Sequence, residues 1–223
     1  MALDLESGSN QYATWTPGST FASLNGVTFS GLVRLESLAF TCLAQVSMGT
    51  VADTVRAGIV INGSGQVIGR AHRLDGGVQS NCNSSTLSTG VTYFVAASFD
   101  FLGSRIDVAV VEVGSPLPGF TTSTTGIATW GSPTSATDPL NGTIGNFGDA
   151  ADPFDGIVQD VRAYARAMTA SEVQDVYYRG GTGGIPPRAW WKMDTTSGTA
   201  TTIADTMNNH AATAVNSPVY VGN

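Results

Sequence analysis

Charge is scarce in this chain of 223 residues, because aspartate, glutamate, lysine and arginine together make up only 12% of it. That is about half the share found in an average globular domain. Lys192 is the only lysine, and the other basic residues are all arginine. The exposed surface must therefore consist mainly of Thr, Ser, Ala, Gly and Asn. Such a surface favours a protein packed in an assembly or displayed on a particle over a freely diffusing one; a mildly acidic soluble domain is the alternative.

The chain also has too few basic residues for a nucleic-acid partner. Its formal net charge is −7, whereas a protein that binds phosphates needs a basic face. No apolar run approaches the roughly 18 residues that a membrane helix requires. No basic segment followed by an apolar one precedes the first strand-like residues, so we expect no signal peptide and synthesis in a cytoplasm.

Cysteine is rare as well, with only Cys42 and Cys82. Cys42 lies in the apolar run LAFTCLAQV, which is typical of a small core residue. Cys82 lies in SNCNSS, a polar segment that predicts a more exposed loop. Without secretion we expect both thiols to be reduced, although the sequence leaves a disulfide between them open.

Periodic helical segments are nearly absent, and the apolar residues gather instead in short runs rich in β-forming residues. Asn62-Gly63 between two such runs predicts a two-residue hairpin turn. Many short strands separated by turns predict an all-β fold, a two-sheet antiparallel β-sandwich or jelly roll. The expected strands cover 3–15, 27–35, 38–48, 57–61, 66–71, 92–101, 105–113, 143–147, 156–165, 190–193, 212–215 and 219–221.

One segment, residues 169–178, predicts a helix. Thr169 is a natural N-cap, and Glu172 three residues later completes the capping-box pattern. Apolar side chains then recur on one face, and Gly180 marks the end of the helix.

Five segments resemble the laminin-G-like, concanavalin-A-like jelly-roll family. The most specific is FDGIVQDVRAYARAMTASEV at 154–173, which is similar to the closing strand and helix of that family. WWKMDTTSGTATTIADTMNNHAATAV at 190–215 is similar to its opening strands. The other three segments are 2–15, 87–110 and 141–148. The resemblance implies two sheets packed face to face, with a concave face that often binds glycans.

The closing segment precedes the opening one, which reverses the usual order of the family. Either the domain is circularly permuted, or the tail completes a neighbouring subunit, or a second domain has been cut short. About 36 residues follow the glycine-rich break at 180–184, too few to bury a core of their own. We therefore expect a single domain over 1–223, with 188–223 supplying the permuted opening strands in cis or to a neighbouring subunit.

The resemblance also implies a structural calcium ion, which many members of the family hold. The matching positions here are Asp160, Asp205 and Asn208, and calcium prefers oxygen ligands of these kinds. The alternative is that Asp205 caps a turn and Asp160 faces solvent or pairs with Arg162.

Catalysis is not expected. Glycoside hydrolases of this shape need two carboxylates on one face, hence acidic residues at alternate positions of a strand. Asp107 and Glu112 are an odd number of positions apart and should face opposite sides. No nucleophile motif, phosphate-binding loop or Cys-x-x-Cys is present.

Two functions are consistent with these observations. The first is a non-enzymatic structural protein of a viral (phage) particle, a capsid decoration (cement) or other exterior virion protein. It would contact the major capsid protein or other virion proteins, form homo-oligomers and reside in the virion. The second is a glycan-binding, lectin-like module used in adhesion. For this role Trp130, in the polar connection 116–137, is the best candidate for an exposed aromatic platform.

Overall fold

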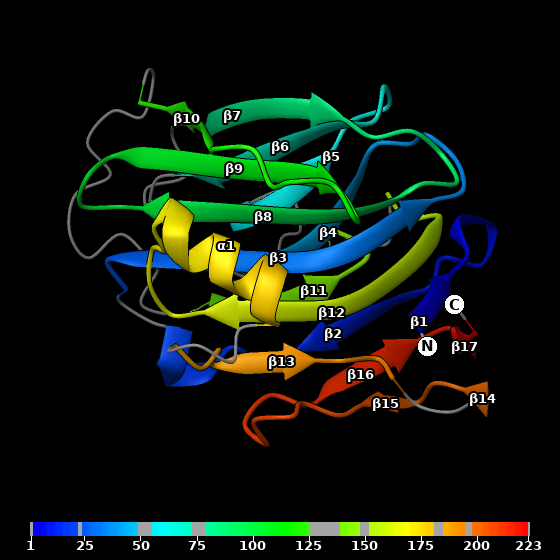
Figure 1. Ribbon diagram of the computed structural model, residues 1–223. Helices are drawn as coiled ribbons and strands as arrows, with labels where there is room; N and C mark the ends of the chain where they lie inside the picture. The colour runs from blue at the N-terminus through cyan, green and yellow to red at the C-terminus, as the bar shows by residue number, and fades with distance from the viewer. Residues whose placement is uncertain are drawn as a thin grey trace.

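The computed structural model describes residues 2–21, 24–48, 55–72, 79–124, 139–147, 152–180, 185–194 and 198–222. These residues form two antiparallel sheets packed face to face, with one short helix on the outside (Figure 1). The predicted all-β sandwich with a single helix is therefore confirmed.

Sheet A has nine strands in the order β10-β9-β8-β3-β12-β1-β17-β14, and β13 also pairs with β12. The chain therefore supplies this sheet from both of its ends and from its middle. The strands are β1 (Ala2–Leu5), β3 (Gly26–Leu35), β8 (Thr92–Asp100), β9 (Arg105–Glu112), β10 (Thr121–Ser123), β12 (Gly156–Tyr164), β13 (Ala189–Trp191), β14 (Gly198–Thr199) and β17 (Val219–Val221).

Sheet B has eight strands in the order β15-β16-β2-β11-β4-β5-β6-β7. Two short 3-10 turns, η1 (Ser7–Ser9) and η2 (Gly18–Phe21), flank β2. The strands are β2 (Tyr12–Trp15), β4 (Thr41–Met48), β5 (Val55–Ile61), β6 (Gln66–His72), β7 (Gln79–Thr86), β11 (Pro139–Ile144), β15 (Thr202–Ile203) and β16 (Ala212–Val215).

One large apolar cluster fills the space between the sheets. Trp191 is wholly buried in it, with its ring centroid 4.9 Å from that of Trp15. The indole nitrogen of Trp191 donates to the carbonyl oxygen of His210 at 2.7 Å, so its one polar atom is paired. Burying an aromatic side chain of this kind contributes about 1.5–3 kcal/mol. The C-terminal segment thus supplies part of the common core.

The first predicted strand, 3–15, was wrong as a single element. β1 belongs to sheet A and β2 to sheet B, and the chain crosses between them through η1. Asn10 adopts a left-handed conformation with φ of 51°, which asparagine tolerates better than most residues. The turn is further held by the Glu6 backbone N–H, which donates to Gln11 Oε1 at 2.9 Å. Local hydrogen bonds therefore break the extended pattern.

The hairpin at Asn62 forms, but its connection runs from Asn62 to Gly65 and is longer than the predicted two residues. Asn62 Oδ1 accepts hydrogen bonds from the backbone N–H groups of Ser64 and Gln66. Gly65 takes the positive φ of 80° that closes the turn, a conformation that glycine adopts without strain.

The exposed loop predicted around Cys82 was also wrong, because that segment is strand β7. Ser80 and Cys82 point toward the core, and Asn81 between them faces outward. Because the outward residues of this strand are polar, its composition resembles that of a loop, and the alternation of buried and exposed positions was not recognised. Cys42 and Cys82 are both buried and free, so they form no disulfide.

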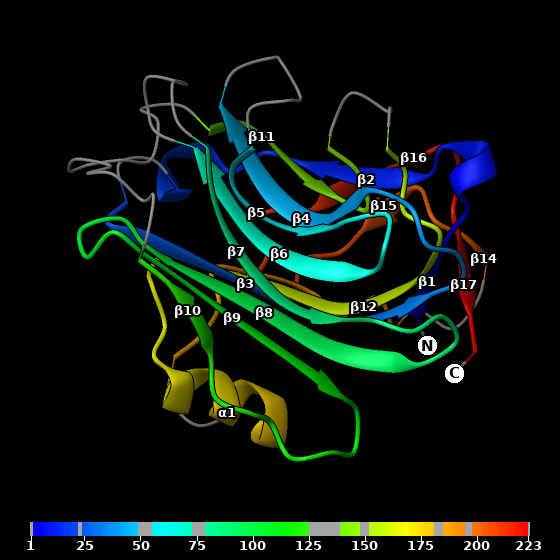
Figure 2. The ribbon, with the colours of Figure 1, turned by 90° about the horizontal axis from the view of Figure 1, so that it is seen from above.

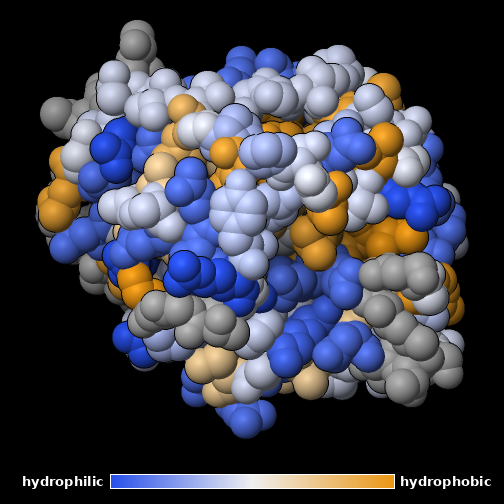
Figure 3. All heavy atoms as spheres, in the orientation of Figure 1, coloured by the Kyte–Doolittle hydropathy of each residue, from blue (hydrophilic) through white to orange (hydrophobic). Residues whose placement is uncertain are grey.

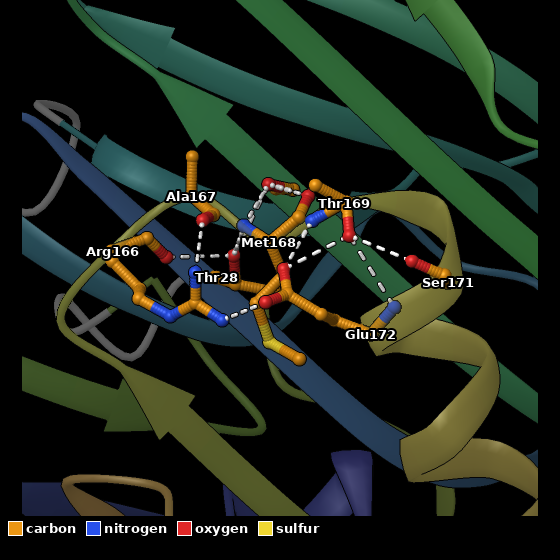
Figure 4. A network of polar contacts seen from close by, with 8 residues as sticks. Thr28, Arg166, Ala167, Met168, Thr169, Ser171 and Glu172 are labelled. Carbon is orange, nitrogen blue, oxygen red and sulfur yellow. Dashed lines mark hydrogen bonds and ion pairs between the residues drawn. The ribbon is translucent and has the colours of Figure 1, made fainter. Parts of the chain in front are cut away.

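The predicted helix is confirmed as α1 (Ala170–Arg179), with Thr169 as N-cap and a complete capping box. Figure 4 shows how the connection before it is fastened to sheet A. The Met168 backbone N–H donates to the hydroxyls of Thr28 and Ser98. Arg166 pairs with Glu172, the acidic member of the capping box. The start of the helix is therefore fixed by both local and long-range bonds.

α1 packs across the outer face of sheet A, which Figure 2 shows as the convex side of the sandwich. Val173 and Val176 lie against Phe94, Ala96 and other outward residues of β8 and β9. No helix in the described part of the chain has the length and apolar character needed to cross a membrane.

The C-terminal strands pair with the N-terminal ones within the same chain. β13 pairs with β12, β17 pairs with β1, and β16 pairs with β2. They thus extend both sheets, as the red and orange strands beside the blue ones show (Figure 1). The circular permutation itself stays a prediction.

Candidate functional site

The two outer faces of the sandwich differ in what lies on them. α1 covers part of the convex face of sheet A. The outer face of sheet B is the concave side of the molecule (Figure 2), and no described residue forms a helix over it. A concave face without such a cover is the better candidate for a ligand.

Sheet B is also unusual in its charge. None of its eight strands contains an aspartate or a glutamate, although the whole chain has a formal net charge of −7. The charged residues in these strands are Arg56 and Arg70. Sheet A, by contrast, has acidic residues in β1, β8, β9 and β12.

A polar row crosses the concave face from strand to strand. Its members are opposite one another in the sheet register, and their strand neighbours Ala13, Val46, Ile59 and Ala71 lie in the core. Because side chains alternate along a strand, the row itself points outward. In order across the sheet, it consists of Thr202, Thr213, Thr14, Thr143, Gln45, Gly58, Arg70 and Asn81.

Gln45 lies at the centre of this row and is wholly buried. Its Nε2 donates to the carbonyl oxygen of Phe147 at 2.6 Å, which fixes the side chain. Its Oε1 has no hydrogen-bond partner among the described residues. A buried acceptor without a partner costs about 1–3 kcal/mol, and this one has no surface that a ligand could contact.

Two phenylalanines form an aromatic platform beside the row. Phe40 is 36% exposed and stacks on the nearly buried Phe147, with ring centroids 5.1 Å apart and planes inclined by 11°. Phe147 belongs to a small outer cluster with Cys42, Val60 and Ile68. The exposed ring therefore rests on a packed base.

Arg70 connects the platform to the polar row. Its guanidinium carbon lies 5.2 Å from the ring centroid of Phe40 and 5.9 Å from that of Phe147. Its Nε is buried and lacks a partner among the described residues. Burial lowers the pKa of Arg70 from its ordinary value, yet a guanidinium stays charged at neutral pH. A partly desolvated cation thus faces the concave side.

The predicted calcium residues lie elsewhere, at the junction of β12 and the C-terminal segment. Asp205 Oδ1 accepts from the backbone N–H groups of Trp190 at 2.7 Å and Met207 at 2.9 Å. Its Oδ2 accepts from those of Asn209 at 3.0 Å and His210 at 2.8 Å. The backbone N–H of Asn208 donates to the Asp205 carbonyl oxygen at 2.9 Å, within the same turn.

The carboxylate of Asp160 also accepts several hydrogen bonds from within the protein. Arg162 donates to both of its carboxylate oxygens, and the indole nitrogen of Trp190 donates to Oδ1. Trp190 thus bonds to both Asp160 and Asp205, which brings the two aspartates to one junction. A calcium ion would have to displace these donors, so the contacts favour the structural alternative for both side chains. The calcium site stays a prediction.

Trp130, the predicted aromatic platform, lies outside the described residues. Sequence reasoning missed Phe40, Gln45, Arg70 and Phe147. The alternation in β4 and β6 could have indicated outward positions for Gln45 and Arg70. No local signal pairs Phe40 with Phe147, because they come from segments more than a hundred residues apart.

A separate acidic cluster lies at one end of sheet A. Carboxylate oxygens of Asp4, Glu6 and Glu36 all lie within 4.8 Å of one another. Burial and the neighbouring Asp155 raise the pKa of Asp4, and the charge of Asp4 raises that of Glu6. Mutual repulsion of this kind is common among exposed acidic groups and does not by itself indicate a ligand.

No protein-family model matches the sequence, and neither does any curated protein. Solved structures do match. A candidate carbohydrate-binding protein from Bacteroides ovatus has a TM-score of 0.67 at 16% identity. The match covers 98% of this chain and spans only 58% of that one. The fold is a jelly-roll β-sandwich.

Two further structures support the same fold. The heptameric SAP-like pentraxin of Limulus polyphemus has a TM-score of 0.56 at 12% identity, over 91% of this chain and 88% of the pentraxin. The CBM40 of the Ruminococcus gnavus IT-sialidase, bound to α2,3-sialyllactose, has a TM-score of 0.55 at 17% identity. That match covers 79% of this chain and 95% of the module. At these identities the likeness concerns the fold alone, and the finer resemblance to laminin-G-like domains stays a prediction.

Proposed function

We propose that this protein is a non-enzymatic carbohydrate-binding module that holds its ligand on the concave face of sheet B. The observation that carries the proposal is the union of three features on that face. They are the exposed ring of Phe40, the exposed amide of Asn81 and the cation of Arg70, which has no ion pair among the described residues. The carbohydrate-binding proteins among the matched structures support the same interpretation.

Each of these features can bind a different part of a sugar. The apolar side of a sugar ring packs on an aromatic face such as Phe40. Sugar hydroxyls can accept hydrogen bonds from Arg70 and from the exposed amide of Asn81. A hydrogen bond to a charged group contributes about 1.5–3 kcal/mol. The strands of this face lack the carboxylate pair that hydrolysis of a glycosidic bond requires, so we propose binding without cleavage.

A glycan array probed with the wild-type protein and with Phe40→Ala tests this proposal. We expect the wild type to bind a defined set of glycans and Phe40→Ala to lose about five- to tenfold in affinity, because stacking contributes on the order of 1–1.5 kcal/mol. Leu102→Ala is the control, since Leu102 is 59% exposed in the β8–β9 turn, away from the face. An array without any ligand, or equal loss in both variants, would refute the proposal.

A role on the exterior of a virion is the second candidate, as a capsid decoration protein or an adhesion module. It is supported by the 12% charged residues and the single lysine, which suit a surface packed in an assembly. Co-sedimentation with empty capsids, or a stable homo-oligomer in analytical ultracentrifugation, would support it. A strictly monomeric chain that does not bind capsids would exclude the decoration role, and the proposal of glycan binding would still stand.

A further inference from the structure

Arg70 differs from the other arginines whose contacts the structure describes. Four of them sit in ion pairs with a carboxylate, and Arg34 and Arg188 are exposed to solvent, whereas Arg70 is partly buried and has no ion pair and no hydrogen bond among the described residues. Its guanidinium lies beside the stacked rings of Phe40 and Phe147. The four paired arginines are Arg105 with Asp107, Arg162 with Asp160, Arg166 with Glu172, and Arg179 with Asp175.

The surroundings of Arg70 leave its charge uncompensated. No strand of sheet B carries an acidic residue, and burial disfavours the charged guanidinium. Partly desolvated cations are expensive unless they are paired. An anionic group on the ligand would supply the missing partner, and the planar guanidinium can donate two parallel hydrogen bonds to a carboxylate or sulfate.

The geometry also fits one ligand across the whole site. Arg70 lies at the edge of the Phe40 platform, so a sugar ring on Phe40 can place an acidic substituent on the guanidinium. Asn81 is exposed and lies opposite Arg70 on the neighbouring strand β7. Adjacent strands are about 5 Å apart, so the same ligand can reach both side chains.

We propose, on the basis of the carbohydrate-binding function above, that the preferred ligand is an acidic saccharide. Its carboxylate or sulfate group binds Arg70, and its ring packs on Phe40. Arg70 thereby determines the selection of anionic over neutral glycans, while Phe40 contributes to the binding of both.

Calorimetric titration with three matched probes tests this inference: lactose, 3′-sialyllactose and 3′-sulfolactose, alongside arrayed uronic-acid and neutral glycans. We expect acidic glycans to bind at least about tenfold more tightly than neutral ones, since each tenfold corresponds to 1.4 kcal/mol. Their affinity should fall as salt is raised, because the Debye length shortens. Binding of carboxylated probes alone, or of sulfated probes alone, would identify the anionic group.

Three variants separate the contribution of Arg70 from folding and from net charge. Arg70→Gln should reduce acidic-glycan affinity to the level of neutral glycans, and Arg70→Lys should retain part of the preference. Arg34→Gln, which removes one positive charge from sheet A, should leave the preference unchanged. Equal affinity for neutral and acidic glycans would overturn this inference while the carbohydrate-binding function stands. Absence of binding to every probe would overturn both.

Discussion

The outer faces of the two sheets use arginine in opposite ways. On sheet A, Arg162 is buried and donates hydrogen bonds to both carboxylate oxygens of Asp160. It also donates to the carbonyl oxygen of Gly180 at the end of α1. Its guanidinium carbon also lies 4.2 Å from the ring centroid of Trp190. On sheet B, Arg70 has aromatic neighbours but no carboxylate. Arg162 thus has its hydrogen-bond partners within the protein, whereas Arg70 can still bind a ligand.

This difference extends to the faces as a whole. In the space-filling view, charged, polar and apolar side chains are mixed over the sheet A face (Figure 3). The helix, the C-terminal strands and several ion pairs meet there. Both sheets have buried polar atoms without a partner among the described residues, such as Ser30 Oγ and Tyr164 Oη in sheet A. On sheet B one of these atoms belongs to Arg70, a cation without an ion pair.

Deleting 188–223 should have the largest effect, because it removes edge strands from both sheets and Trp191 from the core. We expect the truncated chain to lose cooperative unfolding, as measured by circular dichroism during urea titration. A truncated protein that stays folded and monomeric would show that the segment contributes nothing essential to the sandwich.

Replacing each arginine with glutamine tests the comparison directly. Arg162→Gln should lower the free energy of unfolding by about 3–5 kcal/mol, because Asp160 loses its partner in a largely buried site. Arg70→Gln should change it by less than about 1 kcal/mol and should affect ligand binding instead. Urea denaturation of both variants measures this, and an equal loss of stability would contradict the distinction between the two faces.

The acidic cluster on sheet A predicts a smaller, pH-dependent effect. Because the pKa of Asp4 is raised in the folded protein, its ionised form costs stability at pH values above that pKa. The cost disappears as the pH falls through it and the carboxyl becomes protonated. Asp4→Asn should therefore raise the melting temperature near pH 7 and not near pH 3. Asp194→Asn, at an exposed position outside the cluster, is the control; the same rise there would contradict this reasoning.

Calcium should have the smallest effect. The oxygens of Asp205 already accept four backbone N–H groups. We therefore expect the same melting temperature in EDTA and in millimolar calcium. A calcium-dependent rise that Asp205→Asn abolishes would instead establish the metal site that the family resemblance implies.

Several elements were predictable because their signals are local. The capping box of α1 and the hairpin at Asn62 depend on residues within a few positions of each other. β7 was missed because its outward residues are polar. The segment 3–15 was taken as one strand although Gly8, Ser9 and Asn10 are residues that favour a turn. The site was hardest to predict, since Phe40, Gln45, Arg70 and Phe147 meet only after strands from distant segments are assembled.

The sequence by itself determined the β-sandwich, the position of its helix and the poverty of surface charge, because strand alternation, capping and composition are properties of neighbouring residues. Only the tertiary structure decided which side of sheet B is concave and which arginine lacks a partner. Pairing between distant strands places every aspartate and glutamate of the strands in sheet A, whereas Arg70 lies in sheet B, and no short stretch of sequence contains that information.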